Sequence, residues 1–156
     1  MNDLQPLAVL LGQHERQRDT AIADHQRAIN AVNAAKAQAE QLLTYRREYE
    51  QRWSKQFQRE GQIELVRCYQ SFTERLTEAV DQQARIAEHA AQQVERALVT
   101  LREVEMRCAS VRKLIERRVH EARVATDRRD QKQSDEFASR AAWSNRPGAH
   151  GGSRLM

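Results

Sequence analysis

Proline and glycine are almost missing from the central part of this 156-residue chain. The two prolines are Pro6 and Pro147, and the only glycines between them are Gly12 and Gly61. A β-rich or α/β fold of this length would need many more turn residues. Strong helix formers such as Ala, Arg, Gln and Glu fill much of the remainder. The sequence therefore predicts an all-α protein built from very few helices.

Long apolar runs are also missing. No segment approaches the ~20 apolar residues that a membrane-spanning helix requires, and the N-terminus lacks the basic start and apolar core of a secretory signal. Cys68 and Cys108 are isolated and fit no metal-binding spacing. We therefore expect no membrane span, and free thiols in a reducing cytoplasm.

The motifs of common enzymes are missing as well. The chain has no glycine-rich phosphate loop, no GxSxG, no HExxH and no Cys/His cluster. Its five histidines are scattered, the nearest pair being His14 and His25. An extended helical pair also lacks the concave pocket in which catalysis usually takes place. We expect no enzymatic activity, no catalytic residue, no metal and no cofactor.

What the chain does contain is a long heptad pattern. Steps of three and four from Leu4 reach fifteen positions before residue 54, eleven of them apolar. The first seam runs through Leu4, Leu7, Leu11, His14, Arg18, Ala21, His25, Ala28, Val32, Ala35, Ala39, Leu42, Arg46, Tyr49 and Trp53. This spacing is typical of a coiled coil sustained over seven heptads.

A second seam follows Gly61. It runs through Leu65, Tyr69, Phe72, Leu76, Ala79, Gln83, Ile86, Ala90, Val94, Ala97, Leu101, Val104, Cys108, Val111 and Ile115. Two successive steps of four, from Ile86 to Val94, form a stutter that locally relaxes a left-handed supercoil. The two seams predict two helices that pack along most of their lengths.

The polar stretch around Gly61 predicts a tight turn between antiparallel helices. The predicted fold is therefore a long two-helix antiparallel coiled-coil hairpin with unequal helices. Residues 1–142 form the hairpin, with a helix at 4–57, a turn at 58–62 and a helix at 63–142, and residues 143–156 form a disordered tail. The helices would be about 80 and 120 Å long at 1.5 Å per residue. The segment from about Arg118 to Ala142 would then lack a partner helix.

The predicted seam is weak. His14, Arg18, His25 and Arg46 occupy core-type positions, and several other positions hold only alanine. Polar core residues specify register at a cost in stability, and alanine buries little apolar area. We expect a marginally stable helical pair that its partners stiffen.

Two matching stripes lie beside the predicted turn. Fold-back between Glu60 and Gly61 places Tyr49 opposite Phe72, Tyr45 opposite Leu76, Leu42 opposite Ala79, and Gln38 opposite Gln83. One interpretation is ordinary seam packing, because aromatic stripes at helical spacing are usually core. The other is a partly exposed patch that binds a partner, because two helices cannot enclose large aromatic side chains on all sides.

The unpartnered segment is basic. Residues 111–132 carry eight cations and four anions, a net charge of 8 − 4 = +4, while the remaining residues balance. A solvated helix face with i,i+4 ion pairs explains this charge without a partner. Nucleic-acid binding is the weaker functional interpretation, since carboxylates are interspersed and only Phe137 and Trp143 could stack on bases. Docking of the helix into a protein groove or ring is the better one.

Three strings carry a resemblance to a known family: LLTYRREYE at Leu42–Glu50, YQSF at Tyr69–Phe72 and DQKQSDEFASRAA at Asp130–Ala142. With these strings at their observed spacing, the chain resembles the flagellar FliJ family over about residues 4–142. The resemblance implies a stalk of the bacterial flagellar type III export apparatus, which serves flagellum assembly and so motility and chemotaxis. It also implies a role as a general export chaperone, located in the cytoplasm at the inner face of the membrane.

The resemblance further implies two partners. One is the cytoplasmic domain of the export-gate protein FlhA, whose site in the family corresponds to Gln38, Leu42, Tyr45, Tyr49, Phe72, Leu76, Ala79 and Gln83. Some members of the family carry histidine in place of Gln83. The other partner is the hexameric export ATPase FliI, for which we expect contacts from Asp130, Gln131, Lys132, Asp135, Glu136, Phe137 and Arg140. Export chaperones are further possible partners, and nucleic acid is not expected.

Two alternatives stay open at this point. The chain could be the equivalent stalk of a virulence-type secretion system, although the DEF and RAA strings favour the flagellar branch. It could also be a generic coiled-coil scaffold or a polyanion-binding rod, which salt-sensitive binding to nucleic acid would indicate.

Overall fold

The computed structural model describes residues 4–59 and 62–146, and these residues form two long helices. Helix α1 spans Leu4–Arg59 and helix α2 spans Ile63–Ser144. The prediction of an all-α, two-helix antiparallel hairpin with unequal helices is confirmed. Pro6 falls in the first turn of α1, where its missing N–H would have no helical partner in any case.

The helix ends differ from the expected ones by two residues. Helix α1 continues to Arg59 instead of residue 57, because Gln58 and Arg59 are good helix formers and a cation stabilises the negative end of a helix. Gln62 precedes α2, and its carbonyl accepts a hydrogen bond from the Val66 N–H at 3.3 Å. Residues 60–61, the centre of the expected turn, lie outside the described residues.

The end of α2 lies at Ser144, so Trp143 and Ser144 are helical although the sequence pattern assigned them to the tail. The Ser144 hydroxyl and the Asn145 N–H both donate to the Ala141 carbonyl, at 3.0 and 3.1 Å. These bonds satisfy a carbonyl that the helix end would otherwise leave free. Pro147 follows shortly after in the sequence, and a proline disfavours the helical conformation of the residue that precedes it. The rest of the expected tail, residues 147–156, lies outside the described residues.

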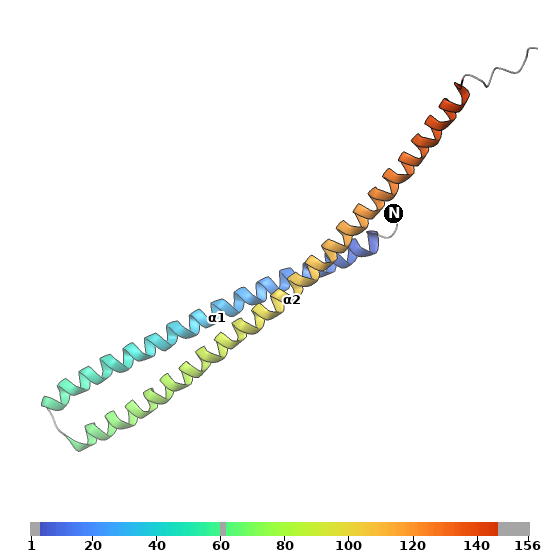
Figure 1. The fold of residues 1–156 in the computed structure, drawn as a ribbon. Helices are drawn as coiled ribbons and strands as arrows, with labels where there is room; N and C mark the ends of the chain where they lie inside the picture. The colour runs from blue at the N-terminus through green and yellow to red at the C-terminus, as the bar shows by residue number, and fades with distance from the viewer. Residues whose placement is uncertain (1–3, 60–61, 147–156) are drawn as a thin grey trace, which may run out of the picture. The chain divides into compact units, whose positions relative to one another are not determined.

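Contacts within the chain divide it into two compact units. The hairpin unit comprises Gly12–Cys108, and the terminal unit comprises Met1–Leu11 together with Ala109–Met156. In the hairpin unit, α1 and α2 run antiparallel side by side (Figure 1). Ring contacts and hydrogen bonds join the two helices, from the Phe57–Tyr69 pair to the Gln83–Gln38 pair.

The core of the hairpin unit is thin. Its buried apolar residues among those described are Ala21, Val32, Ala35, Leu76, Val104 and Cys108. All six fall on the two predicted seams. Most other seam positions are half-buried, because two helices shield each other on one side only.

Two predicted seam positions, Phe72 and Ile86, are exposed, and Ile86 is the clearer case. Ile86 is 47% exposed, whereas its neighbour Ala87 is half-buried. Steps from Gln83 through Ala87, Ala90 and Val94 are four, three and four, which is the regular heptad alternation. With Ala87 in place of Ile86, the two successive steps of four move from Ile86–Val94 to Ala79–Ala87 of the predicted seam. The sequence pattern chose isoleucine over alanine on hydrophobicity, but helix geometry decides which side chain faces the partner.

A charged side chain at a seam position can be long enough for its charged group to reach solvent, as Arg18 shows. Arg18 is half-buried, yet its Nη2 lies 3.1 Å from the Asp19 carboxylate. The hydrogen bond to Asp19 raises the pKa of the Arg18 guanidinium. A long side chain can cover the seam with its methylene stem while its charged end reaches water.

The terminal unit packs the first turns of α1 against α2. Leu4, Leu7 and Leu11 on α1 are half-buried. On α2, Val111 is the buried residue of this unit among those described. Ala122 and Val124 are still half-buried, and every described residue from Ala125 onward is exposed. The fully exposed stretch of α2 thus begins at Ala125, seven residues later than Arg118. In the described ranges, neither helix contains a segment apolar enough to cross a membrane.

Candidate interaction surfaces

The first candidate surface lies in the hairpin unit, where the two expected stripes meet. Tyr49 and Phe72 lie with ring centroids 4.3 Å apart, and the Gln83 amide nitrogen lies 3.2 Å from the Gln38 side-chain oxygen. These contacts confirm the predicted pairing of Tyr49 with Phe72 and of Gln38 with Gln83. The register inferred from a fold-back beside Gly61 is therefore correct at both ends of the stripes.

Exposure divides the eight residues of this surface, which we call the stripe patch, into two sets. Tyr45 is 46% exposed, Phe72 is 36% exposed, and Gln38 is also exposed. Leu76 is only 7% exposed, and the remaining members are half-buried: Leu42, Tyr49, Ala79 and Gln83. Seam packing and surface exposure, which the sequence could not separate, thus both occur, on different residues of one patch.

The exposed Tyr45 and Phe72 rings contact each other and the half-buried Tyr49 ring. The Tyr45 ring lies 6.3 Å from Tyr49 and meets the edge of Phe72 at 6.4 Å. Aromatic pairs in such stacked and edge-on arrangements contribute about 0.5–1.5 kcal/mol each beyond their buried area. The Tyr45 ring is therefore held against the hairpin while much of its surface faces solvent.

An open groove of about 440 Å³ lies beside Tyr45. It is lined by Gln38, Gln41, Leu42, Tyr45 and Gln83. Leucine and tyrosine side chains supply apolar contact area, and the three glutamines supply hydrogen-bonding amides. An apolar surface edged by amides is typical of a protein-binding site.

The aromatic cluster extends beyond the residues that the sequence pattern selected. Trp53 and Phe57 continue the Tyr45–Tyr49 line at i,i+4 spacing, and Tyr69 contacts both of them at 5.8 and 5.2 Å. Tyr49 also stacks on Tyr69 at 5.9 Å. The repeated i,i+4 spacing of four aromatics on α1 was visible in the sequence and was sufficient to predict this extension.

The Tyr49 hydroxyl is affected by its half-buried position. Desolvation raises its pKa, although a hydrogen bond with Trp53 acts in the opposite direction. Because the change is upward from an ordinary value near 10, the phenol stays neutral at physiological pH. Tyr49 therefore contributes ring packing and a hydroxyl, without a charge.

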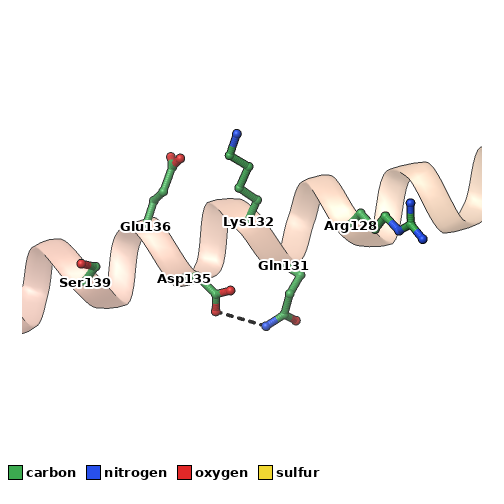
Figure 2. Close-up of a pocket in the computed structure, with 6 residues that line it drawn as sticks. All are labelled: Arg128, Gln131, Lys132, Asp135, Glu136 and Ser139. Carbon is green, nitrogen blue, oxygen red and sulfur yellow. Dashed lines mark hydrogen bonds between the residues drawn. The ribbon is translucent and has the colours of Figure 1, made fainter.

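The second candidate surface is the exposed end of α2 in the terminal unit. An open pocket lies along this helix, and Figure 2 shows the six side chains that line it: Arg128, Gln131, Lys132, Asp135, Glu136 and Ser139. The Gln131 amide donates to the Asp135 carboxylate at 3.1 Å, and Lys132 and Glu136 project to the same side of the helix (Figure 2). Cations and anions alternate here, so the surface is charged without being uniformly basic.

All seven residues expected to contact the ATPase lie on this exposed stretch. They are Asp130, Gln131, Lys132, Asp135, Glu136, Phe137 and Arg140. Phe137 is 77% exposed, a high value for a phenylalanine, and Trp143 is similarly exposed with the Arg146 guanidinium 5.3 Å from its ring centroid. Exposure of large apolar side chains to water is unfavourable, so covering them with a partner lowers the free energy of the complex.

Within residues 4–59 and 62–146, no three His, Cys, Asp or Glu side chains lie close enough to hold a metal ion. The features that stand out are the exposed rings of the stripe patch and the exposed charged end of α2. The described residues thus form a two-helix hairpin that carries two exposed clusters of side chains.

Comparison with known families identifies the class more closely. A family model described as "Flagellar FliJ protein" matches residues 3–147, which is nearly the whole chain. The chain therefore belongs to the flagellar FliJ family, and it is a protein related to flagellar export. The family is a non-catalytic component of export. Searches among curated proteins and among solved structures found no match.

Proposed function

We propose that the chain is a stalk component of the bacterial flagellar type III export apparatus. In this role it links the hexameric export ATPase FliI to the cytoplasmic domain of the export-gate protein FlhA and assists export of flagellar proteins, with export chaperones as further partners. It works in the cytoplasm, at the inner face of the cell membrane beneath the flagellum. Membership of the FliJ family supports the flagellar assignment over a virulence-type secretion system.

The exposure of the Tyr45 and Phe72 rings is the observation that supports binding to the export gate. Both rings pack on the half-buried Tyr49 ring and on each other, so a partner would meet aromatic side chains that are already ordered. Pre-ordered aromatic anchors lose little conformational entropy when a partner binds. In this proposal Gln38, Tyr45 and Phe72 contact FlhA, while Leu42, Tyr49, Leu76, Ala79 and Gln83 support them from the seam.

ATPase binding is proposed for the exposed end of α2. From Ala125 to Arg146 each side chain is exposed, and Phe137 lies among charged residues that include Lys132 and Arg140. A helix that presents a few large apolar side chains among mixed charges can enter a charged groove or ring without aggregating in its absence. The seven residues from Asp130 to Arg140 are the proposed contacts.

Substitution of Tyr45 by alanine tests the gate-binding part. Loss of one exposed aromatic anchor should weaken binding to the FlhA cytoplasmic domain by about 10–30-fold, the effect of an interface hot spot. Helicity should be nearly unchanged, because the two ring pairs of Tyr45 contribute only about 1 kcal/mol each. Titration calorimetry measures the affinity, and circular dichroism measures the helicity.

Phe137→Ala is the matched control, since it removes another exposed aromatic ring that lies in the terminal unit. It should leave gate binding unchanged. Equal loss of gate binding in both variants would contradict the proposed site. A large loss of helicity in Tyr45→Ala would instead assign Tyr45 to the core.

A further inference from the structure

The side chain of Gln83 bridges the two helices of the hairpin unit. Its amide nitrogen donates to the backbone carbonyl of Ala35 at 3.3 Å and to the side-chain oxygen of Gln38 at 3.2 Å. Both acceptors belong to α1, and Gln83 belongs to α2. Gln83 is half-buried and Ala35 is buried, so the first of these bonds lies partly inside the seam.

These two bonds determine which way both amide groups point. A backbone carbonyl only accepts hydrogen bonds, so the group of Gln83 that faces Ala35 must be its NH₂. Both hydrogens of that NH₂ are then used, one for each acceptor. The Gln38 oxygen accepts the second hydrogen, so the NH₂ of Gln38 is the group left to point away from Gln83.

We infer that Gln83 is a positioning residue for partner binding, which acts through Gln38. It holds the Gln38 oxygen against the hairpin and presents the Gln38 NH₂ to the groove beside Tyr45. The partner group that this arrangement fits is a hydrogen-bond acceptor, either a carboxylate or a backbone carbonyl. This inference rests on the proposed function, since it specifies the chemistry of the gate contact at the stripe patch.

The inference also gives a physical meaning to glutamine at this position. A histidine at this position would carry at most one N–H on each ring nitrogen and could not donate twice from one atom. Glutamine can satisfy the Ala35 carbonyl and the Gln38 oxygen from a single atom. The orientation of Gln38 is therefore a property that Gln83 confers on this chain.

The bridge itself is tested on the full chain without a partner. In ¹⁵N–¹H spectra, the Gln83 side-chain amide should exchange with water at least about tenfold more slowly than that of an exposed glutamine, because its hydrogens are bonded. Gln92, an exposed glutamine on the same helix, is the reference. The Gln83→Leu spectrum identifies the resonances. Exchange of Gln83 as fast as that of Gln92 would overturn the inference.

A double-mutant cycle tests the positioning role. Gln38→Ala and Gln83→Leu should each weaken binding to the FlhA cytoplasmic domain by about fivefold, the effect of one hydrogen bond. The double variant should also lose about fivefold, because both changes remove the same contact. Leucine retains apolar volume at this seam position, so folding should be preserved, which circular dichroism checks. Gln92→Leu is the matched control and should bind normally.

The outcomes are distinguishable. A loss of about 25-fold in the double variant, which is the product of the single effects, would mean that Gln83 contacts the partner independently and would overturn the positioning role. Absence of any binding by the unmodified chain would overturn the proposed function and the positioning role together. Slow exchange of the Gln83 amide would in that case still establish the bridge between the helices.

Discussion

At the scale of single residues, Cys68 and Cys108 show how differently two identical side chains can be placed. Cys68 is exposed on α2 near the aromatic cluster, whereas Cys108 is only 1% exposed. Both occur in the same helix, and the heptad pattern distinguishes them, since Cys108 lies on the predicted second seam and Cys68 does not. The difference arises because Cys108 falls on the seam that faces α1.

This difference predicts unequal thiol reactivity. With a disulfide reagent such as Ellman's reagent, Cys68 should react at once. Cys108 should react on the order of a hundredfold more slowly, since it needs local opening of about 2.7 kcal/mol. Stopped-flow absorbance measures both phases, and Cys68→Ser should remove the fast phase alone. Two fast phases of similar rate in the unmodified chain would contradict the burial of Cys108.

The stripe patch could be predicted from the sequence only in part at this scale. Counting outward from the fold-back correctly paired Tyr49 with Phe72, because antiparallel helices of equal rise fix which residues lie opposite. The same counting could not separate exposed Tyr45 from buried Leu76. That distinction depends on how far each helix is rotated about its own axis, which residue numbers alone do not define.

At the scale of helices, the exposed end of α2 differs from the rest of the helix. After Val124 every described side chain of α2 is exposed. Polar side chains such as Gln131 and Asp135 form hydrogen bonds with each other along the helix. Helical hydrogen bonds and local side-chain pairs are sufficient to continue a helix that is already nucleated. This end can therefore be removed without opening the apolar core.

Truncation after Arg129 tests its role. Loss of the seven proposed contacts should weaken binding to the FliI ring by at least about tenfold, the effect of one interface contact of 1.4 kcal/mol. Helicity per residue should be retained, because the removed residues are exposed. Tyr45→Ala is the control and should bind FliI normally. Full binding by the truncated chain would move the ATPase site elsewhere, and binding lost only at high salt would favour a general polyanion site.

At the scale of the whole chain, few side chains hold the two helices together. The buried apolar residues among those described are three small ones on α1 and four on α2, and the larger rings are only half-buried or exposed. Burial of a few small side chains yields a modest hydrophobic free energy. Helices as long as α1 and α2 nevertheless satisfy their own backbone hydrogen bonds.

We therefore expect a marginal free energy of unfolding. The isolated chain should melt in a broad transition with its midpoint below about 45 °C, the lower edge for domains of mesophilic proteins. Circular dichroism at 222 nm follows the transition, and a bound partner should raise the midpoint by mass action. A sharp transition far above this temperature would show that the seam is stronger than its composition indicates.

The sequence by itself determined the helical class, the number of helices, their approximate ends and their register. Proline and glycine scarcity, heptad spacing and one central glycine are local properties, and helix geometry converts them directly into structure. Only the tertiary structure decided that Ala87 replaces Ile86 in the seam, that Tyr45 is exposed whereas Leu76 is buried, and that Gln83 bonds to α1. These features depend on the rotation of one helix against the other, which is set by the packing of all the side chains between them.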